Sequence, residues 1–247
     1  MLKDKDKERG ISMKKAIVLS SGGVDSTTCV AIAVNNLGKD NVSTVSVKYG
    51  QKHEIELSYA QEVADYYDVK HYVLDLSNIL QYSNCPLLAR STEQIKHKSY
   101  SDQIAEDGEG MVSTYVPFRN GLMLSAVAAL AVSMYPKDDV DIYIGAHADD
   151  AAGQAYADCS EAFTDAMKSA ISIGTYDKVH VVAPLVNMNK ANVVRTGLKL
   201  STPYHLTYSC YEGGETPCGT CGTCIDRAAA FAANNIADPA MTIVKKR

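Results

Sequence analysis

The sequence predicts an α/β fold in which a parallel sheet carries helices on both faces, followed by a C-terminal segment of different composition. Three observations lead to this fold class. A short apolar run at 16–20 passes directly into a glycine-rich turn and a helix-like segment, strand-like and helix-like segments then alternate, and glycine, threonine and cysteine dominate residues 210–224. Strand–helix alternation favours parallel strands joined by right-handed crossovers.

Hydrophobic periodicity places the individual elements. Residues 16–20 are continuously apolar, as in a buried parallel strand. Residues 42–49 are β-branched and alternate in polarity, as in a second strand. From 53 to 67 the apolar side chains fall at helical spacing. In chain order we expect a strand at 16–20, a helix at 27–37, a strand at 42–49, a helix at 53–67, a strand at 70–76, a helix at 119–134, a strand at 140–146, a helix at 158–173, a strand at 179–182 and a helix at 190–200.

Two segments depart from the simple alternation. Residues 84–113 are polar and have no clear period. A loop of this length in a compact domain is usually a lid, a binding loop or disordered. Residues 119–134 are apolar nearly all round, which predicts a helix that is buried on every side.

Composition and charge limit the class of protein. Of 247 residues, 46% are hydrophobic and 21% are charged, as in ordinary globular proteins. The 24 basic and 29 acidic residues give a net charge of −5, which argues against a duplex nucleic acid bound by bulk electrostatics. The nearly apolar run at 121–132 is shorter than the about 20 residues that span a membrane. We therefore expect no stable nucleic-acid partner and no membrane association.

The N-terminal residues and the cysteines predict a cytoplasmic protein. Residues 1–12 alternate lysine and aspartate and lack the apolar core of a signal peptide, so we expect a disordered extension there. Without an export signal, the seven cysteines are expected to be reduced. The predicted organisation is the extension at 1–12, an α/β domain at 13–205, and a cysteine-bearing segment at 206–247 packed on it.

A phosphate-binding loop is predicted where the first strand meets the first helix. A helix N-terminus offers unpaired N–H groups, and Gly22 and Gly23 let backbone amides approach an anion. Asp25 suits a metal-bridged or N-cap role. A glycine turn with a plain helix cap is the alternative, and a Walker loop is excluded because its glycine–lysine pattern is absent. The predicted loop residues are Ser20, Ser21, Gly22, Gly23, Val24, Asp25, Ser26, Thr27 and Thr28.

Four cysteines near the C-terminus have the spacing of a metal site. Cys210, Cys218, Cys221 and Cys224 form the pattern C-x7-C-x2-C-x2-C, with glycines between the last three. Four thiolates in tight turns suit a closed, tetrahedral Zn²⁺ site with a structural role. An iron–sulfur cluster, a redox dithiol and four free thiols are the alternatives.

Three polar residues mark further candidate positions. Tyr49 ends the second predicted strand, at the edge where open parallel sheets bind ligands. Arg119 opens a helix against the preference of the helix dipole, which indicates contact with an anion or carboxylate, with a solvated arginine as the alternative. Asp158 is the expected N-cap of the helix at 158–173.

The phosphate loop resembles the signature of the PP-loop ATP pyrophosphatases, a superfamily with a Rossmann-like (adenine nucleotide alpha hydrolase-like) sheet. Within it, the chain resembles the 7-cyano-7-deazaguanine (preQ0) synthase family of queuosine biosynthesis. The matching motifs span about 14–235 and are Ser-Gly-Gly-Val-Asp-Ser-Thr-Thr-Cys at 21–29, Tyr-Gly-Gln-Lys-His at 49–53, Val-Pro-Phe-Arg-Asn at 116–120, Tyr-Ala-Asp-Cys at 156–159 and Ser-Cys-Tyr-Glu-Gly-Gly at 209–214. The chain departs from the family pattern at Phe118, His147, Ala157 and Tyr208.

The resemblance implies an ATP-dependent carbon–nitrogen ligase that converts 7-carboxy-7-deazaguanine and ammonia to the nitrile through adenylated carboxylate and amide intermediates. It implies ATP, Mg²⁺ and Zn²⁺ as cofactors and a homodimer. The implied catalytic residues are Asp25, Ser26, Arg119 and Lys190. The implied substrate-binding residues are Tyr49, Arg119, Asn120, Tyr156, Asp158 and Cys159, with Cys159 either a pocket wall or a nucleophile.

A PP-loop adenylating enzyme with another substrate is the alternative function. That substrate could be a tRNA base, or a protein or base in a defence system. The acidic charge balance and the lack of a basic appended domain speak against tRNA. A non-enzymatic zinc module is a further alternative, which the phosphate loop disfavours.

Overall fold

The computed structural model describes residues 14–108 and 110–242, so the extension predicted at 1–12 lies outside the described residues. Within the described residues, one five-stranded parallel sheet has the strand order β3-β2-β1-β4-β5. Its strands are β1 (Lys14–Leu19), β2 (Val42–Lys48), β3 (Lys70–Asp75), β4 (Asp139–Tyr143) and β5 (Val179–Val182). Ala16 of the central strand lies opposite Val42 on one side and Asp141 on the other. The predicted parallel sheet is confirmed.

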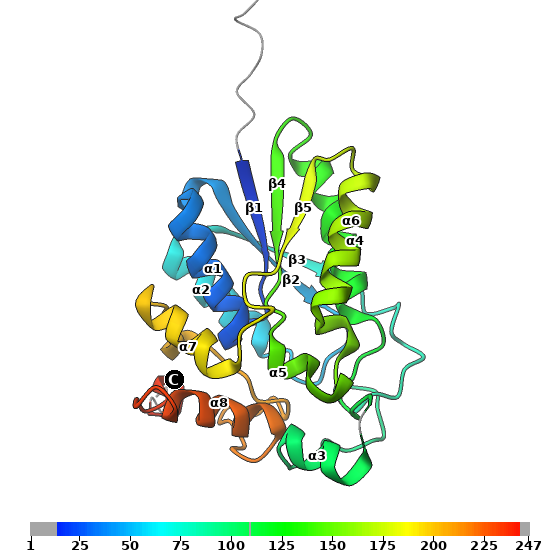
Figure 1. Ribbon diagram of the computed structural model, residues 1–247, viewed down its shortest axis with the longest axis vertical. Coiled ribbons are helices and arrows are strands. Elements are labelled where there is room, and N and C mark those ends of the chain that lie inside the picture. Colours follow the sequence, from blue (N-terminus) through cyan, green and yellow to red (C-terminus); the bar gives the residue numbers. More distant parts are fainter. Residues whose placement is uncertain (1–13, 109, 243–247) are drawn as a thin grey trace, which may run out of the picture.

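Helices cover both faces of the sheet, as predicted (Figure 1). One face carries α1 (Val24–Leu37), α2 (Glu56–Tyr67) and α7 (Lys190–Lys199), and the other carries α4 (Arg119–Met134) and α6 (Glu161–Gly174). Successive side chains of a strand point to opposite faces. Ala16 and Val18 therefore pack on the α1 side, whereas Ile17 and Leu19 pack on the α4 side. Burial on both faces explains the continuous apolar run of β1.

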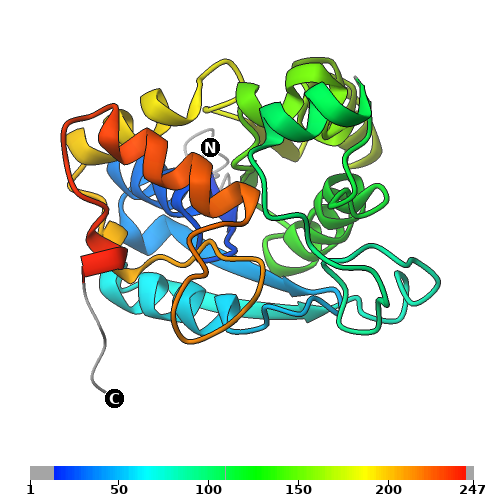
Figure 2. The same ribbon diagram turned by 90° about the horizontal axis from the view of Figure 1, so that it is seen from below.

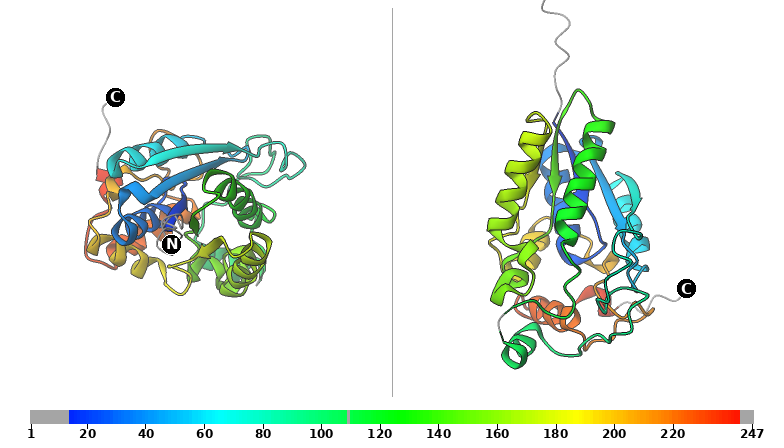
Figure 3. Two further views of the ribbon diagram at one scale, coloured as in Figure 1. Left: turned by 90° about the horizontal axis from the view of Figure 1, so that it is seen from above. Right: turned by 90° about the vertical axis from the view of Figure 1, so that its right-hand side faces the viewer.

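A third group of elements lies across the carboxyl edge of the sheet, seen from below in Figure 2 and from the side in Figure 3. It contains α3 (Tyr100–Asp107), α5 (Ala148–Ala151), α8 (Gly222–Ala232) and α9 (Pro239–Thr242). Helix α8 contacts α7, and Phe231 joins the same buried cluster as Val193. Short 3-10 turns occur at Lys39–Asn41, Ala152–Gln154, Ala157–Cys159 and Tyr204–Leu206.

The structure corrects three sequence-based expectations. The polar stretch 84–113 contains helix α3, whose N-cap Ser99 accepts a hydrogen bond from the Asp102 amide. Helix α4 is buried on one side only, because it covers the sheet from one side, and Val132 is 41% exposed. Helix α6 begins at Glu161 with Ser160 as its N-cap, so Asp158 is not the cap of that helix. The sequence could not predict the one-sided burial of α4, because apolar content does not reveal which side of a helix has a neighbour.

Within residues 14–108 and 110–242, no helix combines the length and apolarity that crossing a bilayer requires.

Candidate active site

A cavity of about 210 Å³ opens at the carboxyl edge of the sheet. Its walls come from the segments that follow β1, β2 and β4, together with the starts of α4 and α7 and the C-terminal segment. The chain runs from β1 outward to β2 and β3, then returns to place β4 on the other side of β1. Open parallel sheets bind ligands at such a reversal of strand order.

The phosphate loop forms one end of this cavity. Ser20, Ser21, Gly23, Val24, Asp25 and Ser26 line the cavity. The Ser26 hydroxyl accepts a hydrogen bond from the Ser21 amide and donates one to the Gly23 carbonyl, both at 3.2 Å. These bonds hold the turn in a shape that leaves the start of α1 facing the cavity.

Glycine is required at the two loop positions, 22 and 23, for different structural reasons. Gly22 has φ +71°, and a Cβ there would lie 2.7 Å from both Ala60 N and Glu56 O of α2. Gly22 therefore permits close packing of the loop on α2. A Cβ on Gly23 would have its nearest neighbour at 3.4 Å and would point toward the space that the cavity offers.

The last two predicted loop residues lie beneath the cavity. Thr27 and Thr28 are fully buried and do not line the cavity. The Thr28 hydroxyl bonds to the Val24 carbonyl and to the Tyr204 hydroxyl, both at 2.8 Å. Thr28 therefore ties α1 to the chain after α7.

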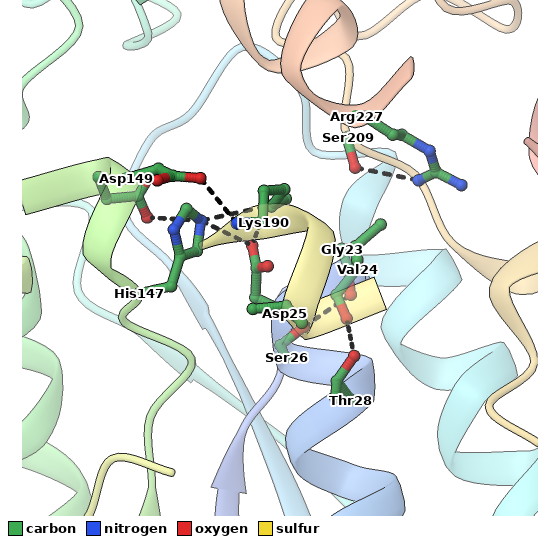
Figure 4. A network of polar contacts seen from close by, with 12 residues as sticks. Gly23, Val24, Asp25, Ser26, Thr28, His147, Asp149, Lys190, Ser209 and Arg227 are labelled. Carbon is green, nitrogen blue, oxygen red and sulfur yellow. Dashed lines mark hydrogen bonds and ion pairs between the residues drawn. The ribbon is translucent and has the colours of Figure 1, made fainter. Parts of the chain in front are cut away.

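Charged side chains from three elements meet beside the phosphate loop (Figure 4). Lys190 Nζ donates to Asp25 Oδ2 at 2.5 Å and lies 3.2 Å from His147 Nε2. His147 Nε2 also lies 3.2 Å from Asp150 Oδ2. Burial raises the pKa of Asp25, but the charges of Lys190 and His147 outweigh it, so the pKa lies below its usual value.

Two further carboxylates border this cluster. Burial raises the pKa of Asp150, with His147 and Lys190 opposing the shift. Burial raises the pKa of Asp226 in α8 to about 6, with Lys190 opposing. Carboxylates of this kind are held together only by cations, and a bound metal ion is one such cation.

Unpartnered polar atoms show that this end of the cavity fits a polar ligand. In residues that line the cavity, Ser20 Oγ, Asp25 Oδ1 and His147 Nδ1 are buried and have no hydrogen-bond partner within the described residues. Buried polar atoms without partners are costly and uncommon. The residues therefore fit a phosphate-bound Mg²⁺ ion, for which Asp25 and Asp150 are the available carboxylates.

Arg119 lies at a different part of the cavity, among aromatic side chains. Its guanidinium donates to the Tyr49 hydroxyl at 3.2 Å and lies 5.4 Å from the centre of that ring. Tyr100, Tyr208 and Tyr211 also line the cavity. Between residues 14 and 242, leaving out residue 109, no carboxylate makes an ion pair with Arg119. A partly buried cation without an ion-pair partner is suited to an anionic ligand.

The remaining predicted substrate residues separate into two groups. Asn120 and Cys159 line the cavity, whereas Tyr156 and Asp158 do not. Tyr156 bonds through its hydroxyl to Thr114 Oγ1 at 2.5 Å. Burial raises the pKa of the Cys159 thiol well above its usual value. Since the thiolate is the nucleophile, this environment favours a pocket wall for Cys159.

The four C-terminal cysteines form a compact cluster. Their Sγ atoms all lie within 4.8 Å of one another, and Cys210, Cys221 and Cys224 are buried. Four sulfurs on one tetrahedral Zn²⁺ ion, each at about 2.3 Å, would lie roughly 3.8 Å apart. The amides of Cys218 and Cys221 donate to Cys210 Sγ and Cys218 Sγ at 3.2 and 3.3 Å. The cysteines are free of disulfides, and their arrangement fits a closed metal site.

Sequence reasoning singled out His147 and Tyr208 as departures from the family pattern near the expected substrate pocket, and both line the cavity. It missed Asp150, Tyr211 and Asp226, which also line the cavity. Asp150 follows β4 at the carboxyl edge, and that position was the available signal. Tyr211 and Asp226 lie beside the metal ligands in sequence, where no local pattern points to a second role. Only the folding of the C-terminal segment over the sheet edge brings them into the cavity.

Comparison with known proteins gives a consistent match over nearly the whole chain. A family model described as queuosine biosynthesis protein QueC matches residues 15–235. The 7-cyano-7-deazaguanine synthase of Archaeoglobus fulgidus is 38% identical over 229 residues, which cover 92% of this chain and 90% of the relative. That of Thermoplasma acidophilum is 39% identical over 233 residues, which cover 92% and 91%. Among solved structures, NMN synthetase from Francisella tularensis aligns with a TM-score of 0.46 at 16% identity, over 91% of this chain and 78% of that chain.

Proposed function

The chain belongs to the QueC family of queuosine biosynthesis proteins, and we propose that it is an ATP-dependent ligase that converts 7-carboxy-7-deazaguanine and ammonia to 7-cyano-7-deazaguanine (preQ0). One observation carries this proposal beyond the family match. The phosphate loop and a guanidinium without a carboxylate partner line the same cavity. A nucleotide phosphate and a substrate carboxylate can therefore meet there.

The chemistry explains why ATP is needed. A carboxylate resists attack by ammonia because its leaving group would be oxide. Transfer of the adenylyl group to a carboxylate oxygen releases pyrophosphate and makes AMP the leaving group, and ammonia then forms the primary amide. A second adenylation, on the amide oxygen, allows loss of AMP and two protons to give the nitrile. Each nitrile therefore consumes two ATP.

At the phosphate end, this chain holds ATP through backbone and side-chain donors. The Gly23 amide and the Ser21 hydroxyl, in residues that line the cavity, contact the β and γ phosphates, and Lys190 neutralises phosphate charge. Asp25 and Asp150 would hold Mg²⁺, which would neutralise part of the phosphate charge.

At the other end, Arg119 binds the substrate carboxylate and orients it for transfer of the adenylyl group. Tyr49 and Tyr211 form apolar walls beside it, suited to a flat heterocycle. Cys159 completes the wall. Asn120 also lines the cavity, and its side chain donates to Cys159 Sγ.

The C-terminal segment supports both ends. Cys210, Cys218, Cys221 and Cys224 would hold a structural Zn²⁺ ion, which fixes the conformation of the segment that carries Tyr208, Tyr211 and Asp226. The proposal includes a homodimer that acts in the cytoplasm on these small molecules, as the family resemblance implies.

Product analysis tests the function. The protein is incubated with the deazaguanine acid, ATP, Mg²⁺ and ammonium, and products are followed by mass spectrometry. We expect two AMP and two pyrophosphate for each nitrile, accumulation of the amide when ATP is limiting, and conversion of purified amide. Release of ADP and phosphate, or refusal of the amide, would contradict the mechanism. ATP turnover with no nitrile would favour another substrate on the same loop.

A further inference from the structure

The turn at Ala157–Cys159 is joined to the start of α4 by three hydrogen bonds. The Asn120 amide donates to Asp158 Oδ2 at 2.9 Å, and the Asn120 side chain donates to the Asp158 carbonyl at 3.0 Å and to Cys159 Sγ at 3.3 Å. Asp158 is 4% exposed and does not line the cavity. Its carboxylate therefore faces the protein and not the ligand space.

Asp158 performs for α4 the task of a capping residue. The N-cap position of α4 is Phe118, which provides no side-chain cap. Unpaired amides at a helix start are stabilised by a carboxylate that accepts their hydrogen bonds. Its negative charge also interacts favourably with the positive end of the helix dipole. Asp158 supplies this carboxylate from 38 residues further along the chain. Arg119 is the residue between Phe118 and the bonded Asn120.

The other side of Arg119 is held as well. Phe118 adopts φ +51°, in the left-handed region that a bulky side chain seldom occupies. Its amide donates to the Tyr115 hydroxyl at 3.0 Å, and its ring packs edge-on against Phe163 of α6 with centroids 5.9 Å apart. Such a conformation persists only where its surroundings hold it. Arg119 thus lies between two fixed neighbours.

We infer that Asp158 is a positioning residue for Arg119: its bond to the Asn120 amide fixes the first turn of α4 and so keeps the guanidinium directed at the substrate carboxylate. This inference rests on the proposed function, because it assigns that carboxylate to Arg119. It also replaces the substrate-binding role that the family resemblance implies for Asp158, since its side chain is buried and bonds to the start of α4.

Five proteins test the inference: wild type, Asp158→Ala, Asp158→Asn, Arg119→Ala and the double variant Arg119→Ala/Asp158→Ala. Kinetics are measured with the acid and with the amide as substrates. Asp158→Ala should raise KM for the acid by on the order of tenfold and change KM for the amide much less. Asp158→Asn should recover most of that loss, because its side-chain oxygen still accepts from the Asn120 amide. The double variant should be no worse on the acid than Arg119→Ala alone, since residues acting as one unit are not additive.

Three outcomes would overturn the inference. Asp158→Asn could lose as much as Asp158→Ala, as expected for a carboxylate that reads the donor edge of the base. The losses of the two single variants could add on the acid, or Asp158→Ala could affect acid and amide equally. If Asp158→Ala does not fold, the KM of Asp158→Asn for the acid decides: a value near that of the wild type supports the inference, and a rise of about tenfold overturns it. A wild-type protein that makes no nitrile refutes the proposed function, whereas additive losses in an active protein refute only this inference.

Discussion

The two ends of the cavity handle charge in opposite ways. Beside the phosphate loop, Lys190, Asp25, His147 and Asp150 contact one another, so positive and negative groups largely balance within the protein. At the other end, Arg119 lies against Tyr49 and has no carboxylate partner among the described residues. A balanced cluster can exchange partners when a phosphate and a metal ion arrive. The charges of Asp158 and Asp150 act on Arg119 without forming an ion pair with it, so a ligand can supply the direct counter-charge.

In the proposed function, this difference would separate binding of a common cofactor from selection of a substrate. Nucleotide phosphates are recognised by backbone amides and by charges that can rearrange. A single oriented guanidinium instead discriminates an acid from its neutral amide. The C-terminal segment reaches both ends, with Asp226 beside Lys190 and Tyr211 on the cavity wall beside the other tyrosines.

Removing a metal ligand should disrupt both ends of the cavity and should have the largest effect of the substitutions considered. Cys221→Ser should lower the yield of folded protein or cost several kcal/mol, because the binding energy of a structural Zn²⁺ ion is folding energy. Elemental analysis and thermal unfolding measure this. Cys85→Ser is the matched control, since Cys85 lies outside the cluster and a serine can still donate to Ser113 O. Iron with sulfide, or well-folded protein without metal, would contradict a zinc site.

Truncating one cation at each end should separate their roles. Arg119→Ala should weaken use of the acid more than use of the amide, by about 1.5–3 kcal/mol for a lost charge-assisted contact. Lys190→Ala should impair both substrates equally and raise KM for ATP, because phosphates are common to both steps. Steady-state kinetics with acid and amide make the comparison. Equal losses for Arg119→Ala would assign Arg119 to the phosphate side.

The two loop glycines offer a test within the phosphate end. Gly22→Ala places a Cβ against the α2 backbone at positive φ and should cost about 1–3 kcal/mol of unfolding free energy. Gly23→Ala has room at φ −86°, so stability should change by less than about 0.5 kcal/mol while ATP affinity falls. Chemical denaturation and nucleotide binding measure the two effects. Unchanged ATP affinity in Gly23→Ala would place the phosphates elsewhere.

The smallest effect concerns the pH dependence of stability. Asp226 has its pKa raised by burial to about 6, so the folded protein binds its proton more tightly than the unfolded chain does. Its contribution to stability is present at low pH and is lost as pH rises from about 4 to about 6. Asp226→Asn should remove this slope and raise stability at neutral pH by less than about 1 kcal/mol, given its partial exposure. Urea unfolding between pH 4 and pH 7 tests the sign. If the pH dependence of the unfolding free energy is unchanged in Asp226→Asn, another titratable group causes it.

Much of the fold could be predicted because its signals are local. The alternation of β1, α1 and β2 is visible in short windows of sequence. The start of α4 at Arg119 was predicted, but its one-sided burial depends on which neighbours pack against it. Helix α3 was missed because its eight residues are mostly polar and its cap lies inside a long irregular stretch.

The sequence by itself determined the parallel α/β class, the glycine-rich turn between β1 and α1, and the spacing of the four cysteines, since each depends on residues close together in the chain. Only the tertiary structure decided that Lys190 meets Asp25 across 165 residues. It also decided that Asp158 bonds to α4 and not to the ligand space, and that Asp226 enters the cavity from the metal segment. The physical reason is that hydrophobic period and turn chemistry act within one element, whereas the meeting of distant side chains depends on how all the elements pack together.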